Sequence, residues 1–260
     1  MNGGYTLIYA SDLDRTLIYS QSFLDSHPTD VEITLVDKSK TNSFMTNKVI
    51  DELQALCRKP GILFVPVTNR SIDEYRRINI PGIKPRYSIT TSGGHIFKGD
   101  KFINEWEEYL DSLIDVNRLY EIVNTIQSME SVKYDPRIVD GRYVFSKSSD
   151  RERTKEELIE LRKQNTDFVF YLEKSKIYAI PKCFNKGKAL EWLAAYLGEK
   201  LILASGDGEL DVSMMEIADI ALVPEHHNIK NMESIASHSL LATGYVESPL
   251  STFEVVRKIS

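Results

Sequence analysis

The chain has 260 residues with 32 basic and 38 acidic side chains, and its net charge of −6 argues against nucleic acid or an anionic membrane surface as a partner. That length suffices for one large domain or two modest ones, and no stretch approaches the ~18 apolar residues that a membrane-spanning helix needs. The first residues lack the basic region of a signal peptide, and the two cysteines, Cys57 and Cys183, form no CxxC pattern, so we expect a reduced, cytoplasmic protein.

The first predicted element is a buried strand at the apolar run Leu7-Ile8-Tyr9-Ala10. It leads into Ser11-Asp12-Leu13-Asp14-Arg15-Thr16, so two carboxylates lie where the strand ends. Ligands of doubly wound α/β sheets bind at the carboxyl ends of the strands. A carboxylate pair at that place suits a hard divalent cation, although an acidic turn with no ligand is the alternative and the pair alone does not decide.

Between this strand and the next, residues 21–46 are polar with an alternating patch at 31–35, which predicts a small flap or hairpin beside the site. A helix follows at Asn47–Arg58, ended by Pro60-Gly61. Its apolar stripe is Val49, Ile50, Leu53, Leu56 and Cys57.

A second apolar run, Gly61–Val67, ends in Thr68-Asn69-Arg70-Ser71. Pro66 lies inside this predicted strand, so we expect a bulge or an N–H position that the ladder does not use. Gly93-Gly94, further on, indicates a turn with positive φ.

The segment 99–180 differs in character and predicts a compact α+β domain of about eighty residues. It contains an apolar helical stripe from Leu119 to Ile126, a charged helix with a capping-box pattern at Thr154–Glu157, and two strands at 168–172 and 176–180. Candidate substrate contacts are Arg137, Arg142 and Tyr143, with an ordinary surface role as the alternative for each.

Lys186 begins an amphipathic helix, and the apolar run Leu201–Ala204 then ends in Ser205-Gly206-Asp207-Gly208-Glu209-Leu210-Asp211. A further strand at 219–223 and a terminal helix after Pro249 complete the pattern. His226-His227 indicates a surface turn near the cleft, because adjacent side chains point apart and no matching cluster accompanies them.

These elements predict an α/β fold: a Rossmann-like, doubly wound parallel sheet formed by residues 1–98 and 181–260, with an inserted α+β cap at 99–180. The edge of that sheet would gather a carboxylate pair, a hydroxyl, an amine and a second carboxylate pair. This set is typical of a phosphate-and-magnesium site.

The order DxDxT, a strand ending in Thr, KGxAL and GDxxxD resembles the haloacid dehalogenase (HAD) superfamily, from Asp12 to Asp211. The long interval between Thr68 and Lys186 resembles members with a large C2-type cap. These are the Cof-type, sucrose-phosphatase-like and mannosyl-3-phosphoglycerate-phosphatase-like phosphatases.

The resemblance implies a role for each matching residue. Asp12 would be the nucleophile that forms an aspartyl-phosphate, and Asp14 the general acid and base. Thr68 and Lys186 would act on the phosphoryl group, with Asn69 and Arg70 beside them in phosphate or substrate binding. Mg²⁺ would be held by Asp12, Asp14 (through its backbone carbonyl), Asp207 and Asp211.

The implied activity is magnesium-dependent hydrolysis of a small phosphorylated metabolite, such as a sugar phosphate, with no nucleic acid or membrane partner and no indicated oligomeric state.

A dehalogenase needs no acid for its leaving halide, so Asp14 favours a phosphatase. Leu210 stands where relatives usually have asparagine, which leaves open a weakly catalytic binding or regulatory protein. A receiver-type signalling domain is a further alternative, but it needs a shorter chain and another order of motifs. For Arg15 and Arg70, contact with substrate and ion pairing to the scaffold are both open.

Overall fold

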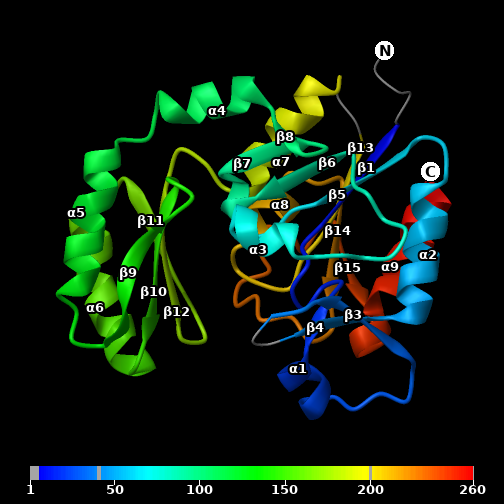
Figure 1. Cartoon of the computed structure of the whole chain (residues 1–260), viewed down its shortest axis with the longest axis horizontal. Helices are drawn as coiled ribbons and strands as arrows, with labels where there is room; N and C mark the ends of the chain where they lie inside the picture. Colours follow the sequence, from blue (N-terminus) through cyan, green and yellow to red (C-terminus); the bar gives the residue numbers. More distant parts are fainter. Residues whose placement is uncertain (1–5, 40–41, 199–200, 260) are drawn as a thin grey trace. The chain divides into compact units, whose positions relative to one another are not determined.

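The computed structural model describes residues 6–39, 42–198 and 201–259, and the chain divides into two compact units (Figure 1). The first combines residues up to Ile103 with those from Lys186 onward, and the second comprises Asn104–Asn185. The division does not fall at Gly99, because β8 (Lys101–Phe102) pairs with β7 (His95–Lys98) inside the first unit.

The first unit contains a five-stranded parallel sheet in the order β15-β14-β13-β1-β5. Its strands are β1 (Leu7–Ser11), β5 (Ile62–Pro66), β13 (Leu201–Ser205), β14 (Ile220–Pro224) and β15 (Ser239–Ala242). Ser11 lies in register with Ser205 on one side and with Pro66 on the other. The residues that follow these three strands therefore meet at one edge of the sheet.

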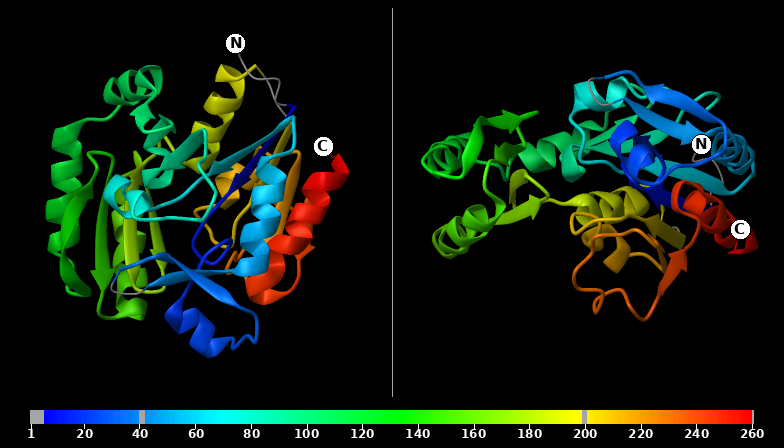
Figure 2. Two further views of the ribbon diagram at one scale, coloured as in Figure 1. Left: turned by 45° about the vertical axis from the view of Figure 1, so that its right-hand side comes forward. Right: turned by 90° about the horizontal axis from the view of Figure 1, so that it is seen from below.

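Helices cover both faces of this sheet, as a doubly wound fold requires (Figure 2). α2 (Asn47–Cys57) and α9 (Ser248–Ile259) pack together and share one apolar core with Leu7 and Tyr9 of β1. The intervening Ile8 and Ala10 point to the opposite face and are also buried. α7 (Lys186–Tyr196) and α8 (Val212–Glu216) pack against each other, and α8 contacts β13 and β14.

The predicted stripe of α2 is confirmed at four positions, Val49, Ile50, Leu53 and Leu56, which are buried. Cys57 is exposed, so its assignment to the stripe is wrong. It is the last residue of the helix.

Pro66 ends β5, which lies at the edge of the five-stranded sheet. The Val67 N–H donates to the Ser11 carbonyl at 2.8 Å, so Pro66, one residue earlier, faces away from β1. On that other side, the chain pairs with β6 (Tyr87–Thr90) at an isolated bridge between Val67 and Ile89, and the N–H that donates there, to the Ile89 carbonyl, is that of Thr68. The missing N–H of Pro66 therefore interrupts no ladder.

The flap predicted for residues 21–46 is a three-stranded antiparallel sheet with the order β2-β4-β3. It consists of β2 (Tyr19–Ser20), β3 (Ile33–Asp37) and β4 (Ser43–Thr46), with α1 (Gln21–Ser26) after β2.

β6, β7 and β8 form another small sheet, and α3 (Ile72–Arg76) follows the Thr68 loop. In the β6–β7 turn, φ is +99° at Gly93 but −69° at Gly94, so only the first glycine needs its conformational freedom.

The second unit is a four-stranded antiparallel sheet, β11-β12-β10-β9, with helices α5 and α6 packed on one face. Its elements are α4 (Asn104–Asp111), α5 (Val116–Gln127), β9 (Val132–Val139), β10 (Tyr143–Ser148), α6 (Arg151–Gln164), β11 (Phe168–Glu173) and β12 (Lys176–Pro181). The expected capping box at Thr154 is wrong, because Asp150 caps α6 and Thr154 is buried in the helix. Its hydroxyl bonds to Ser131, Ser148 and the Asp150 carbonyl.

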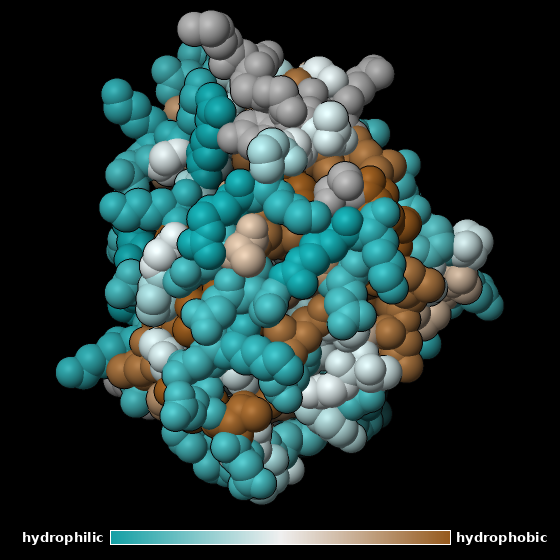
Figure 3. Space-filling model, turned by 90° about the vertical axis from the view of Figure 1, so that its right-hand side faces the viewer, coloured by the Kyte–Doolittle hydropathy of each residue, from teal (hydrophilic) through white to brown (hydrophobic). Residues whose placement is uncertain are grey.

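The side of the molecule seen in Figure 3 is mainly hydrophilic, with apolar areas between the polar side chains. Among the helices of the described residues, none combines the length and apolar character needed to cross a membrane.

Candidate active site

Asp12 directly follows β1, and its N–H donates to the Ser205 carbonyl at 2.8 Å. The chain then makes a tight turn in which the N–H groups of Thr16, Leu17 and Ile18 all approach the Leu13 carbonyl, with Arg15 at a φ of +64°. Asp12 is buried, whereas the Asp14 side chain is 50 % exposed. The two carboxylates of the first motif therefore occupy different environments.

Lys186 joins the first and last carboxylates of the predicted set. Its Nζ lies 2.7 Å from Oδ1 of Asp12 and 2.5 Å from Oδ1 of Asp211, and its side chain is fully buried. Burial alone would lower the pKa of Lys186, but the two carboxylates outweigh it and raise that pKa, so the amine stays charged. For Asp12, burial dominates and raises the pKa, with Lys186 opposing the rise and the neighbouring carboxylates adding to it.

Two glycines permit this approach. A Cβ on Gly187 would lie 2.0 Å from the backbone oxygen of Ser213 in α8, so only glycine lets the first turn of α7 pack this closely. A Cβ on Gly206 would lie 2.3 Å from the Cβ of Asp211. Both glycines bring charged residues of neighbouring segments within reach of Asp12.

Asp211 is held by the loop that follows β13. Its Oδ2 accepts hydrogen bonds from the N–H groups of Asp207 (3.1 Å) and Gly208 (2.9 Å), while its Oδ1 accepts from Lys186. Leu210 is buried in this loop and adds no polar group. Backbone N–H groups and Lys186 thus fix Asp211 without the amide that the resemblance leads us to expect at position 210.

Asp12, Asp207 and Asp211 each offer a carboxylate oxygen, and these atoms lie within 4.8 Å of one another. These buried carboxylates pair with Lys186 and with Arg15, whose Nε is 3.2 Å from Oδ2 of Asp207. Clustered carboxylate oxygens suit a hard divalent cation, so these residues fit Mg²⁺. The Asp14 side chain lies outside this group, and the part predicted for its backbone carbonyl stays a prediction.

Thr68 and Asn69 follow β5 and therefore lie at the same edge of the sheet as Asp12. Thr68 is buried, and its hydroxyl accepts a hydrogen bond from the Arg70 N–H at 3.2 Å. The Asn69 side-chain oxygen accepts from the Ser92 hydroxyl at 3.0 Å. Both residues have the expected position, and their contacts with phosphate stay predictions.

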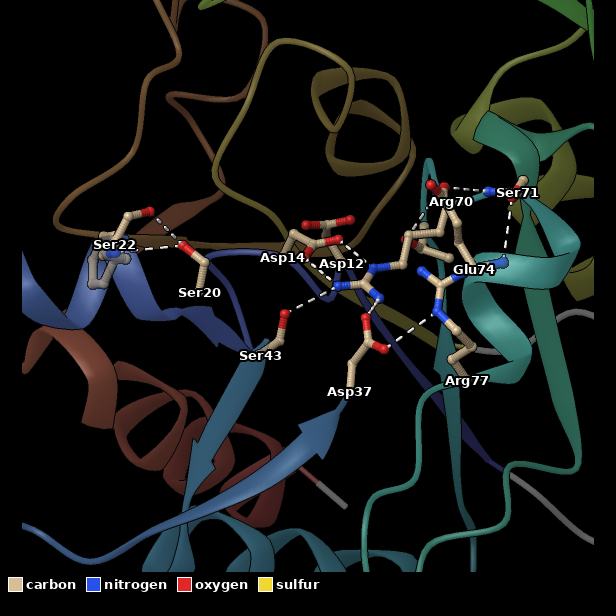
Figure 4. A network of polar contacts seen from close by, with 12 residues as sticks. Asp12, Asp14, Ser20, Ser22, Asp37, Ser43, Arg70, Ser71, Glu74 and Arg77 are labelled. Carbon is tan, nitrogen blue, oxygen red and sulfur yellow. Dashed lines mark hydrogen bonds and ion pairs between the residues drawn. The ribbon is translucent and has the colours of Figure 1, made fainter. Parts of the chain in front are cut away.

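Arg70 points to carboxylates of the protein itself (Figure 4). Its Nε and Nη2 each lie 2.8 Å from an oxygen of Asp14, and its Nη1 lies 2.5 Å from Oδ2 of Asp37. For Arg70 the structure thus shows ion pairing to the scaffold, one of the two expectations for this residue. Sequence reasoning missed Asp37, because a single aspartate at the end of a short strand carries no motif.

Arg15 is likewise paired within the first unit. It contacts Asp207, and its Nη2 donates to the His226 carbonyl at 2.9 Å, while Nε2 of His226 lies 2.7 Å from the Arg15 carbonyl. The His226 ring also packs against Phe23, with 5.0 Å between ring centroids. The expected surface turn is therefore half-buried at His226 and supports the Asp14–Arg15 loop.

Of the candidate substrate residues in the second unit, only Arg137 is exposed. Arg142 is buried and pairs with Glu107 and Asp111 of α4, so it serves the fold of this unit. Tyr143 is also buried. On the sheet face opposite α5 and α6, the Arg137 guanidinium lies 5.2 Å from the centre of the Phe145 ring.

Residues 5–238 match the family model described as sucrose-6F-phosphate phosphohydrolase. The chain belongs to this family. It is therefore a phosphatase of the HAD type, which confirms the resemblance carried by the motifs and rules out the receiver-type alternative. Among curated proteins, the comparison finds no match.

Solved structures share the fold of this phosphatase over nearly its whole length. The sucrose-phosphatase from Synechocystis sp. PCC6803, solved in complex with sucrose and phosphate, has a TM-score of 0.69 at 15 % identity and covers 96 % of this chain and 97 % of its own. A haloacid dehalogenase-like hydrolase from B. subtilis has a TM-score of 0.66 at 17 % identity, with 95 % and 97 % covered. A sugar phosphatase of HAD subclass IIB has a TM-score of 0.66 at 13 % identity, with 98 % and 99 % covered. The α/β fold predicted from the sequence is thus confirmed.

Proposed function

We propose that this phosphatase hydrolyses small phosphorylated sugars with Mg²⁺ as its cofactor and Asp12 as its nucleophile. The observation that carries the proposal is the buried Lys186 bridge, which orients Asp12 through Oδ1 and leaves its Oδ2 for attack on phosphorus. Phosphoryl transfer depends mainly on positioning and electrostatics, and the described residues supply both.

In the proposed reaction, Oδ2 of Asp12 forms a bond to phosphorus while the bond between phosphorus and the ester oxygen breaks. Asp14 gives a proton to the departing alkoxide. Asp14 then takes a proton from a water molecule that attacks the aspartyl-phosphate, which releases phosphate and restores Asp12. Thr68 donates its hydroxyl to a phosphoryl oxygen, and Lys186 balances the charge that collects on Asp12 and the phosphoryl group.

Asp12, Asp207 and Asp211 would hold the Mg²⁺ ion, with the Asp14 carbonyl as a proposed further ligand. When bound, the ion neutralises negative charge on the phosphoryl oxygens. The carboxylate cluster supports this choice, because carboxylate oxygens suit a hard cation such as Mg²⁺, whereas Zn²⁺ and Cu²⁺ are better matched by imidazole or thiolate ligands.

The substrate class rests on the second unit, for which we propose the role of a cap that contacts the part of the substrate beyond its phosphate. Arg137 and the half-buried Phe145 ring, 5.2 Å from the guanidinium, offer a cation beside an aromatic face. A sugar hydroxyl can bond to the cation while its C–H groups pack on a ring. A reduced, cytoplasmic setting suits such a metabolite and belongs to the proposal.

The proposal is tested by assaying purified protein against a panel of phosphorylated metabolites that includes sucrose-6F-phosphate, with Mg²⁺, with chelator, and with Ca²⁺. We expect turnover of at least one sugar phosphate, loss of activity in chelator and its return with Mg²⁺ but not Ca²⁺, whose looser coordination does not hold an in-line geometry. Full activity in excess chelator would rule out the metal. Binding of a sugar phosphate without turnover would favour the regulatory alternative.

A further inference from the structure

Asp37 is a buried carboxylate that none of the sequence motifs includes. It is the last residue of β3 in the flap, and its side chain is 2 % exposed. Its Oδ2 lies 2.5 Å from Nη1 of Arg70, and its Oδ1 lies 3.4 Å from Nε of Arg77. A buried carboxylate is costly unless it is paired, so these contacts are needed for Asp37 to remain in the folded flap.

Arg70 connects Asp37 to Asp14 through the opposite edges of one planar group (Figure 4). Nε and Nη2 hold both oxygens of Asp14, Nη1 holds Asp37, and Nη2 also approaches the Ser43 hydroxyl at 3.3 Å. Four of the five N–H groups of this guanidinium are thus directed at protein oxygens. Burial would lower the pKa of Arg70, but Asp14 and Asp37 outweigh it and raise that pKa, so the guanidinium stays charged.

The Asp14 carboxylate is half exposed and lies in a tight turn, so its χ angles are not fixed by packing alone. A bidentate pair with arginine fixes both the distance and the plane of a carboxylate. The guanidinium can do this only while it is itself fixed, and Asp37 and Ser43 fix it from the flap. The orientation of Asp14 therefore depends on a residue 23 positions further along the chain.

We propose that Asp37 is a positioning residue for Asp14 and acts through Arg70. The inference rests on the proposed function, in which Asp14 protonates the leaving group. It assigns the flap a part in proton transfer, because the end of β3 determines where the Asp14 carboxyl lies. The charged guanidinium favours the ionised carboxylate, which is the form of Asp14 after it has given its proton to the leaving group and before it takes one from water.

The test compares Asp37→Asn with the wild type on two esters: the best sugar phosphate of the panel and 4-nitrophenyl phosphate. A sugar alkoxide needs a proton to leave, whereas nitrophenolate needs little help. We expect kcat/KM of Asp37→Asn to fall about 10–100-fold for the sugar phosphate, part of the 10²–10⁴-fold effect typical of acid–base catalysis, and less than about 3-fold for the nitrophenyl ester. Asp14→Asn should show the same selectivity with a larger loss.

Two further variants separate positioning from a general structural role. Arg77→Gln removes the longer, more exposed contact of Asp37 and leaves Arg70 in place. The ratio of kcat/KM for the sugar phosphate to kcat/KM for the nitrophenyl ester should therefore not change. In an Asp14→Asn background, Asp37→Asn should have no further effect on the sugar phosphate, because the group it positions is gone.

Equal losses on both esters, or additive losses in the double variant, would overturn the role of Asp37 while leaving the proposed function intact. If Asp37→Asn does not fold, Arg70→Lys tests the same link, because an ammonium keeps the positive charge but cannot bind both carboxylates in a fixed plane. An equal loss of kcat/KM on both esters in Arg70→Lys would also overturn the role of Asp37. Wild-type protein that hydrolyses neither ester would overturn the proposed function and this inference with it.

Discussion

At the residue scale, the site depends on the balance of charge around Lys186. One buried amine serves two carboxylates from different strand ends, Asp12 after β1 and Asp211 after β13. Its pKa is raised because both partners favour the charged form. Lys186 therefore stabilises the fold and, in the proposed function, also takes part in the chemistry.

Replacing Lys186 with methionine should leave two buried carboxylates without their cation. Breaking a buried ion pair from one side costs about 3–5 kcal/mol, so the free energy of unfolding should fall by that order and turnover should be lost. Urea denaturation and kcat measured on the same preparation check this. Lys188→Met is the control, because Lys188 lies on the same helix but is exposed. Near-normal activity of Lys186→Met would contradict the role assigned to Lys186.

His226 gives a prediction on pH. Burial lowers its pKa, so the folded protein binds this proton less readily than the unfolded chain, whose His pKa is about 6.5. The contribution of neutral His226 to stability is present above that value and is lost as pH falls below it. We expect the wild type to lose more free energy of unfolding between pH 7.5 and 5 than His226→Gln, which keeps a donor for the Arg15 carbonyl. Identical losses in the two proteins would contradict a half-buried ring that stays neutral.

At the element scale, the strands that form the site could be predicted because their information is local. β1, β5 and β13 are continuous apolar runs followed directly by polar motifs.

Helix starts were harder to predict from the sequence. Asp150, and not Thr154, caps α6, because both residues suit a cap and the path of the chain decides between them. The pairings of Arg70 with Asp14 and Asp37 join residues 56 and 33 positions apart, and no local pattern encodes such contacts. For the same reason the buried pairing of Arg142 with α4 could not be expected.

The packing of α7 on α8 gives a prediction at Gly187. A Cβ there would lie 2.0 Å from the Ser213 oxygen, so Gly187→Ala must push the first turn of α7 outward and draw Lys186 away from Asp12. Overpacking of this kind lowers the free energy of unfolding by about 1–3 kcal/mol, and we expect turnover to fall as well. Gly99→Ala is the control, because its Cβ meets no atom within 4 Å and only its φ of +60° is strained. Normal kcat in Gly187→Ala would show that α7 tolerates the shift.

At the scale of the whole molecule, the motif residues all belong to the first unit, whereas the exposed Arg137 and the Phe145 ring beside it belong to the second. This division supports the proposal that chemistry and substrate choice belong to different units. The sequence indicated it through the long interval between Thr68 and Lys186, but it did not tell exposed Arg137 from buried Arg142, since burial depends on the packing of α4.

Arg137→Ala should therefore affect substrates unequally. We expect kcat/KM for the sugar phosphate to fall about 10-fold, the value of one charge-assisted hydrogen bond of about 1.5 kcal/mol, with little change for 4-nitrophenyl phosphate. Arg153→Ala on α6, an exposed arginine of the same unit, is the control. Equal losses on both substrates would place Arg137 in the general support of the fold.

The central claim is that Asp12 forms a covalent bond to phosphorus. The most direct measurement is mass spectrometry of peptides from protein quenched in acid during turnover, using wild type, Asp14→Asn to slow hydrolysis of the intermediate, and Asp12→Asn. We expect one phosphoryl group on the peptide that contains Asp12, more of it in Asp14→Asn, and none in a folded but inactive Asp12→Asn protein. A phosphoryl group on another residue, or turnover that persists in Asp12→Asn, would contradict the claim.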